Sequence, residues 1–108
     1  MDYTELRARR RLLRRYLRRY RLEQTETAYK AVEGILQRLP DDHPAAQIMR
    51  LRYKECRNWR TVEDRTFYCH SRAFELETAA IDALLQSTEV VDAITSWEAA
   101  QELGGGTE

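Results

Sequence analysis

Arginine is concentrated at the start of this 108-residue chain, in a pattern that could bind phosphate groups. Nine arginines occur among the 15 residues from Arg7 to Arg21. Side chains three or four residues apart share one face of a helix, and Arg7, Arg11, Arg14, Arg18 and Arg21 follow that spacing. A guanidinium donates to two phosphate oxygens at once, and arginines that bind nucleic acid release its counterions. The spacing predicts a phosphate-binding face. The alternatives are a solvated face, or one paired with acidic residues of the same or a partner chain.

The histidines and cysteines do not form a pattern typical of a catalytic or metal site. Cys56 and Cys69 show neither a Cys-x-x-Cys nor a zinc-ligand spacing, and His43, beside a proline, is expected to be a cap or solvent-exposed group. Cys69 and His70 are adjacent, but neighbours on a helix point about 100° apart, and no orienting carboxylate is evident. Phosphate loops, paired catalytic carboxylates and a Ser-His-Asp signature do not occur. The sequence therefore predicts no enzyme, no metal ion and no cofactor.

Charge is distributed unevenly along the chain, although the formal net charge is zero. Residues 1–22 carry a net +7, residues 23–72 carry +1, and residues 73–108 carry −8 with no Lys or Arg. Such asymmetry is typical of a protein with a polyanion-binding end and an acidic end. The sequence has no apolar run near the roughly 20 residues that span a membrane, no signal peptide, and too few cysteines for a disulfide framework. We therefore expect a cytoplasmic protein that does not enter membranes.

The composition favours helix almost throughout, with only four Gly and two Pro. Residues 1–39 are predicted to be an arginine-rich amphipathic helical segment, either one long helix or a helical hairpin. Its apolar stripe includes Leu13, Leu17 and Ile35. Because that stripe is longer than the rest of the chain is expected to cover, it predicts a homodimer.

Residues 43–86 have the pattern of a helix-turn-helix. Asn58 can cap a short helix over residues 59–65, a turn follows over 66–69, and a longer helix is predicted over 70–85. Residues 87–103 are predicted to form a C-terminal helix, and residues 104–108 a flexible tail. The predicted fold class is all-α, with the N-terminal segment followed by the helix-turn-helix and the last helix.

Four short segments of this region carry a resemblance to a known family. They are Ile48-Met49-Arg50-Leu51-Arg52-Tyr53, Asn58-Trp59-Arg60-Thr61-Val62, Tyr68-Cys69-His70-Ser71-Arg72 and Ala80-Ile81-Asp82-Ala83-Leu84. Together, over about residues 46–85, they resemble the region-four helix-turn-helix of bacterial sigma factors, and more closely the small phage and mobile-element regulators of the ArpU and RinA type. Phe67 stands where that family has its turn glycine. Because Phe resists the left-handed conformation, we expect a remodelled turn.

The resemblance implies a DNA-binding transcriptional regulator of phage or mobile-element type. Its second helix would lie in the major groove of double-stranded DNA, and a dimer would bind two half-sites. With the arginines added, the predicted DNA-binding residues are His70, Ser71, Arg72, Arg60, Arg65, Arg7, Arg11, Arg14 and Arg18.

A second hypothesis belongs to another class of protein. An inhibitor of phage counter-defence type, like an anti-CRISPR protein, would bind a host protein such as RNA polymerase or another nucleic-acid enzyme. Its acidic C-terminal third would imitate DNA phosphate. The predicted partner-binding residues are then Glu75, Glu77 and Asp82. The resemblance favours the first hypothesis, and the charge of residues 73–108 favours the second.

Overall fold

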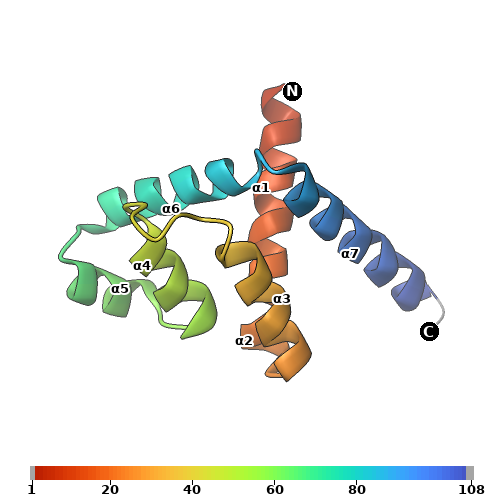
Figure 1. Cartoon of the computed structure of the whole chain (residues 1–108), viewed down its shortest axis with the longest axis horizontal. Helices are drawn as coiled ribbons and strands as arrows, with labels where there is room; N and C mark the ends of the chain where they lie inside the picture. The colour runs from red at the N-terminus through yellow and green to blue at the C-terminus, as the bar shows by residue number, and fades with distance from the viewer. Residues whose placement is uncertain (1, 107–108) are drawn as a thin grey trace.

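The computed structural model describes residues 2–106, with side chains described for residues 2–103. Within that range the chain is helical and forms no strand, which confirms the predicted all-α class (Figure 1). The N-terminal segment comprises α1 (Tyr3–Leu17), α2 (Arg19–Glu23) and α3 (Glu26–Leu36). Asp2 caps α1, since its Oδ1 accepts a 2.8 Å hydrogen bond from the Glu5 N–H.

The N-terminal segment is a helical hairpin, the second of the two expected forms. Gln24 adopts a left-handed conformation with φ 54°, and the Thr25 hydroxyl then caps α3 by accepting from the Ala28 N–H at 3.1 Å. The chain therefore reverses, and α3 packs against α2. Because of this reversal, Leu13, Leu17 and Ile35 are buried within one chain. The stripe that suggested a homodimer is covered internally, and the dimer stays a prediction.

The next helical stretch has two parts, α4 (Ala46–Met49) and the π-helical turn η1 (Arg50–Lys54). In η1 the backbone is wider than in an α-helix, because the Glu55 N–H donates to the Arg50 carbonyl, five residues back, at 3.0 Å. Tyr53 is buried, whereas Arg52 lies over the ring of Trp59. The stretch ends at Cys56, which is left-handed with φ 57°.

The helix-turn-helix consists of α5 (Trp59–Thr66) and α6 (His70–Leu84), joined by residues 67–69. Asn58 caps α5 as expected, since its Oδ1 accepts from the Thr61 N–H at 2.9 Å. The expectation of a remodelled turn is wrong in its detail. Phe67 itself adopts the left-handed conformation, with φ 63°, and its N–H donates to the Glu63 carbonyl at 2.9 Å.

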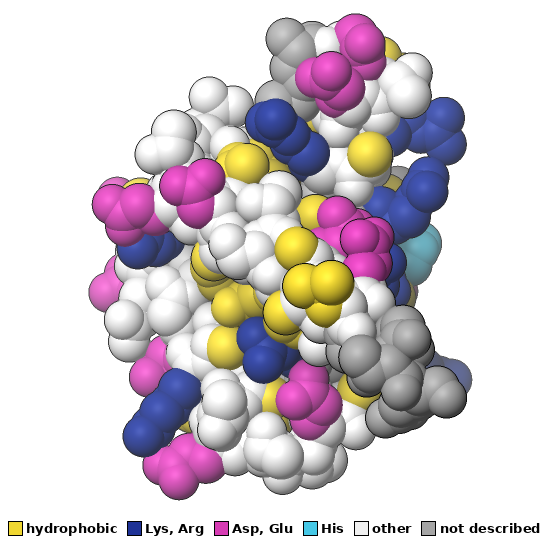
Figure 2. Space-filling model, turned by 90° about the vertical axis from the view of Figure 1, so that its right-hand side faces the viewer, with side chains coloured by type: hydrophobic (Ala, Val, Ile, Leu, Met, Phe, Trp, Pro, Cys, Tyr) yellow, Lys and Arg dark blue, Asp and Glu magenta, His cyan; other side chains and the backbone are white. Residues whose placement is uncertain are grey.

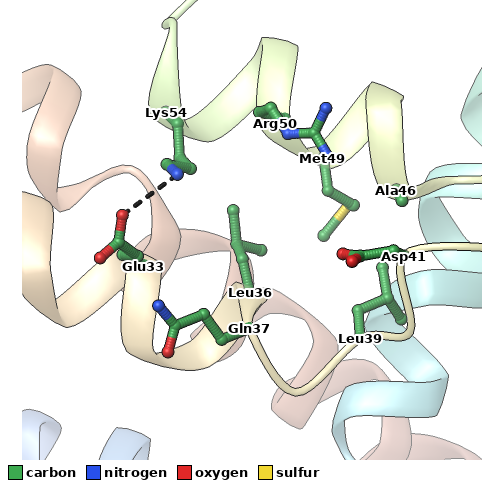
Figure 3. Close-up of a pocket in the computed structure, with 9 residues that line it drawn as sticks. All are labelled: Glu33, Leu36, Gln37, Leu39, Asp41, Ala46, Met49, Arg50 and Lys54. Atoms are coloured by element: carbon green, nitrogen blue, oxygen red, sulfur yellow. Dashed lines mark ion pairs between the residues drawn. The ribbon is translucent and has the colours of Figure 1, made fainter.

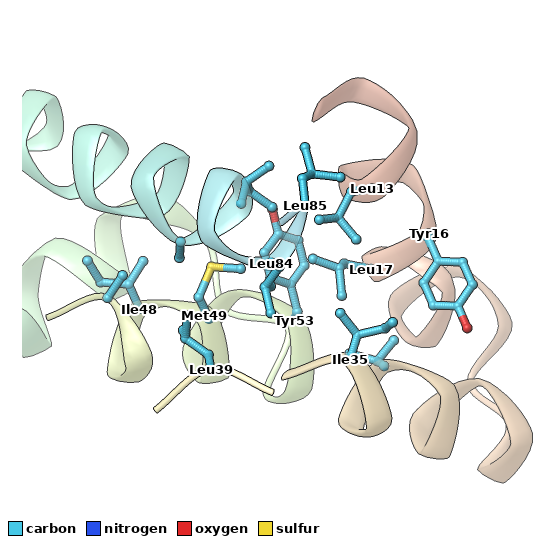
Figure 4. Close-up of a cluster of buried hydrophobic side chains, with 14 of the residues drawn as sticks. Leu13, Tyr16, Leu17, Ile35, Leu39, Ile48, Met49, Tyr53, Leu84 and Leu85 are labelled. Carbon is cyan, nitrogen blue, oxygen red and sulfur yellow. The ribbon is translucent and has the colours of Figure 1, made fainter. Parts of the chain in front are cut away.

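The core lies where α1, α3, the α4–η1 stretch and α6 meet (Figure 4). Figure 4 shows Leu17 from α1, Ile35 from α3 and Met49 from α4 pointing into one cluster, with Tyr53 and Leu84 beside them. Burial of this cluster is the main stabilising contribution to the fold.

The last helix, α7 (Thr88–Gly106), packs on α1 and then extends away from the other helices (Figure 1). Val90 and Ile94 are buried, and Trp97 meets Tyr16 edge to face with 5.4 Å between ring centroids. The expected flexible tail began at residue 104, but residues 104–106 are helical, and residues 107–108 lie outside the described range. Among the described residues, no helix combines the length and the apolar character that membrane crossing requires.

Candidate nucleic-acid interface

The arginines of α1 form a groove on the surface of the protein. Its volume is about 330 Å³, and the residues that line it are Tyr3, Arg7, Arg10, Arg11, Arg14 and Arg18. Hereafter these six residues are the arginine groove. Arg7, Arg11 and Arg18 are exposed and form no ion pair with any residue in the described range. Three of the four predicted arginines of α1 are therefore free to contact an anion.

The fourth arginine, Arg14, has an internal partner. Its Nη2 lies 2.7 Å from Glu77 Oε1 and also donates to Thr78 Oγ1 at 2.9 Å. Glu77 is on α6 but faces inward, with 1% of its surface exposed, and it also accepts a 2.6 Å hydrogen bond from the hydroxyl of Tyr53. Burial lowers the pKa of Arg14, but the hydrogen bonds and charge of Glu77 outweigh it, so that the pKa lies above its ordinary value. Arg14 therefore joins α1 to α6.

A second ion pair joins the same two helices. Arg10 Nε and Nη2 each donate to one oxygen of Asp82 at 2.7 Å, in a bidentate arrangement. The hydrogen bonds with Asp82 raise the pKa of Arg10, although burial opposes this shift. The two pairs hold the arginine groove against α6.

Because Arg14 and Arg10 neutralise Glu77 and Asp82, α6 presents less negative charge to solvent. On its exposed side lie Ser71, Arg72 and Glu75. Arg72 Nη1 is 3.8 Å from Glu75 Oε1, and both side chains are more than half exposed. Two of the three acidic residues that would repel DNA are thus compensated inside the fold.

Aromatic rings surround His70 at the start of α6. The His70 ring lies 5.5 Å from Trp59 and 6.4 Å from Phe74, measured between centroids. Its Nδ1 is 2.9 Å from Glu63 Oε2, so the structure does supply the orienting carboxylate that was not evident from the sequence. His70 and Cys69 are both exposed, and the described residues contain no cluster of three metal-ligating side chains.

The other predicted DNA-binding residues lie on α5. Arg60 is exposed and has no ion pair among residues 2–103, whereas Arg65 Nη1 is 3.5 Å from Glu55 Oε1. They are not part of the arginine groove. The structure therefore brings together only the residues of α1, with α6 beside them.

The acidic side chains of residues 73–103 do not form one acidic surface. Glu77 is buried, so its prediction as a partner-binding residue is wrong, because its carboxylate is enclosed by Arg14 and Tyr53. Asp82 is held by Arg10. On α7, Glu89 pairs with Arg38, and Glu98 lies 3.5 Å from Arg15. Figure 2, viewed from the side of α7, shows acidic side chains in separate groups among basic and apolar ones.

A further cavity lies between α3 and the α4–η1 stretch (Figure 3). Its volume is about 110 Å³, and Figure 3 shows Leu36 and Met49 in its wall with the Lys54–Glu33 ion pair, 3.2 Å apart, at one side. Most ligand pockets occupy about 300–1,000 Å³. This cavity is too small for such a ligand.

Sequence reasoning did not single out Arg10 or Phe74 as a site residue. Arg10 follows Arg7 by three residues and precedes Arg14 by four, so helical spacing could have placed it on the same face. Phe74 is 46% exposed and lies under the Arg14 guanidinium, at 5.3 Å from the ring centroid. No signal in the sequence distinguishes it from the core residues around it.

Fold and site together define an all-helical protein in which a helix-turn-helix is flanked by an arginine groove. Comparison of the chain with protein families, with curated proteins and with solved structures finds no match. The resemblance to sigma region four consequently remains a hypothesis.

Proposed function

We propose that this protein binds double-stranded DNA as a regulator of phage or mobile-element type, with α6 as the recognition helix. The arginine groove contacts the phosphates beside the major groove that α6 enters. The position of the arginine groove is the main support for the proposal. Two of its arginines, Arg10 and Arg14, form ion pairs with α6 and hold the groove beside that helix.

The dimensions of the groove are suited to a nucleic-acid backbone. Arg7 and Arg18 are eleven residues apart, which corresponds to about 16 Å along a helix. One strand of DNA carries a charge for about every 3.4 Å of its axis. A line of exposed arginines of this length therefore spans several phosphates.

The charge of α6 also supports DNA as the ligand. Glu77 and Asp82 are neutralised by Arg14 and Arg10, and Glu75 is accompanied by Arg72. Arg72 and Ser71 provide the exposed donors of the first turn. Because one short helix makes few base contacts, we keep two copies on two half-sites as part of the proposal.

The inhibitor hypothesis receives less support. A mimic of DNA requires a continuous row of acidic groups, whereas Asp82, Glu89 and Glu98 pair within the chain. Binding of a host protein would then depend on Glu75 and on few other acidic residues.

A comparison of two double variants tests the proposal. Arg7→Gln with Arg11→Gln removes two charges from the arginine groove, and Arg15→Gln with Arg38→Gln removes two charges from the side of α7. Gln is nearly as good a helix former as Arg, so both variants should fold. Affinity for a mixed-sequence duplex is measured by fluorescence anisotropy between about 50 and 200 mM salt.

The expected result is a smaller salt dependence for the groove variant alone. Each phosphate contact contributes about 0.9 to the slope of log affinity against log salt, so the slope should fall by about 1.8 for each bound copy. The α7-side variant should keep the slope of the unsubstituted protein. Equal slopes in all three proteins would show that the groove does not contact DNA.

A further inference from the structure

A second group of basic residues lies beyond the end of the arginine groove, where α2, η1 and the start of α5 meet. A small cavity of about 60 Å³ is lined there by Arg21, Arg52, Cys56, Arg57 and Asn58. Hereafter this cavity is the Arg52 pocket. Space for one water corresponds to about 10–15 Å³ measured in this way. The Arg52 pocket therefore has room for a group of a few heavy atoms, such as a tetrahedral oxyanion, but is too small for a nucleobase.

Arg52 is the unusual residue of this pocket, because it is half-buried and has no acidic partner. Its Nη1 donates to the Arg57 carbonyl at 3.0 Å, and its guanidinium lies over the Trp59 ring, 4.7 Å from the centroid. Its Nε is buried and forms no hydrogen bond within the described range, and no described carboxylate pairs with it. Removing a charge from water is unfavourable unless an opposite charge compensates it.

Arg14 provides an internal comparison. It is also half-buried, and Glu77 neutralises it with a 2.7 Å contact. Arg52 instead has further cations nearby. Burial lowers its pKa, and the positive charges of Arg21 and Arg18 lower it further, while Tyr53 and Glu77 oppose this shift. An anion near Arg52 would compensate its charge.

The other residues of the pocket favour an anion as well. Arg21 is exposed and forms no ion pair within residues 2–103, and Arg57 has only a 3.7 Å contact to the exposed Glu55. Asn58 begins α5, whose N-terminal end carries a partial positive charge. Arg21 is one helical turn from Arg18, so the pocket continues the line of cations that starts in the arginine groove.

We propose that the Arg52 pocket binds a single phosphate group, held by Arg21, Arg52 and Arg57. The phosphate is either a free ion or a phosphodiester of bound nucleic acid, and only the second source rests on the proposed function. In both cases the ligand supplies the negative charge that Arg52 lacks.

Trp59 provides a direct readout, because its ring stacks under the Arg52 guanidinium. In a Trp97→Phe background Trp59 is the only tryptophan, and its emission is followed while inorganic phosphate replaces chloride at constant ionic strength. The thermal midpoint in the same two salts is a second readout that needs no substitution of Trp97.

The matched variants remove two charges each. Arg21→Gln with Arg57→Gln changes the pocket, whereas Lys30→Gln with Arg38→Gln changes exposed cations that do not line it. We expect a saturable change in emission and a rise in midpoint for the unsubstituted pocket and for the control. The pocket variant should bind phosphate about tenfold or more weakly, since charged hydrogen bonds are lost. A non-saturable change of equal size in all proteins, as phosphate gives by exclusion from surfaces, would overturn the proposal.

Duplex titrations of the same variants identify the source of the phosphate. A smaller salt slope for the pocket variant than for its control indicates a phosphodiester, and equal slopes with lost phosphate binding indicate the free ion. If the protein binds the duplex but does not respond to phosphate, the pocket does not bind phosphate, and the proposed DNA-binding function is unaffected. If the protein binds phosphate but not the duplex, the proposed DNA-binding function is wrong, and phosphate binding by the Arg52 pocket still holds.

Discussion

Arg14 Nη2 lies 2.7 Å from Oε1 of Glu77, so a cation of α1 neutralises a buried carboxylate of α6. This contact gives the arginines of α1 two different tasks. Arg14 holds α6 in place, whereas Arg7, Arg11 and Arg18 remain available to a ligand.

Two substitutions on α1 separate these tasks. Arg14→Gln leaves the carboxylate of Glu77 without its cation and should lower the free energy of unfolding by about 3–5 kcal/mol. Arg11→Gln changes an exposed residue and should alter it by less than about 0.5 kcal/mol. Urea denaturation of the two variants measures the difference. Equal stabilities would mean that Glu77 does not depend on Arg14.

The hydrogen bond from Tyr53 to Glu77 predicts a dependence of stability on pH. Burial, and then the negative charge of Glu77, raise the pKa of Tyr53 above its ordinary value of 10.0. Because the folded state holds this proton more tightly, the stabilisation is complete below pH 10 and is lost as the pH rises further.

Tyr53→Phe should therefore cost about 1.5–3 kcal/mol near neutral pH. The stability gap between the two proteins should shrink above pH 10, by about 1.4 kcal/mol per pH unit. Denaturation at a series of alkaline pH values follows the gap. A gap that stays constant through this range would contradict the assignment of the proton to Tyr53.

The sequence predicted the helix-turn-helix well, because local signals determine its boundaries. The Asn58 cap and the apolar spacing of α6 identified both helices to within about one residue. The π-helical form of η1 had no such signal, since it depends on how Tyr53 and Arg52 pack. The hairpin was one of two predicted forms. The chain reverses at the left-handed Gln24, and glutamine is not a residue type from which a turn can be predicted.

Replacement of Phe67 by glycine should stabilise the protein. A left-handed conformation costs a residue with a Cβ about 1–2 kcal/mol, and this ring is 92% exposed, so packing does not compensate. Phe67→Gly should raise the free energy of unfolding by about 0.5–1 kcal/mol, after the larger unfolded-state entropy of glycine is subtracted. Phe67→Ala keeps the unfavourable conformation and serves as the control. A destabilised glycine variant would show that the exposed ring contributes to the fold.

The site was harder to predict than the fold. Helical spacing placed Arg7, Arg11 and Arg18 correctly on one face. The same spacing could not show that Arg14 has a buried partner, because Glu77 is 63 residues away in the sequence. Residues that pair across the fold look identical in sequence to residues that face solvent.

Two substitutions on the exposed side of α6 test its contact with DNA. Arg72→Ala should weaken duplex binding by about 1–3 kcal/mol while stability changes little. Glu75→Gln removes a negative charge and should strengthen binding. Anisotropy titrations of both variants measure the effects. If neither affinity changes, α6 does not face the DNA.

The salt dependence of duplex binding by the unsubstituted protein tests the central claim most directly. Three exposed arginines of the groove predict a slope of log affinity against log salt of about −2.7 for each bound copy, and steeper if Arg21, Arg52 or Arg72 also contact phosphates. A protein that fails to bind the duplex even at about 50 mM salt, or binds it without salt dependence, would contradict the account.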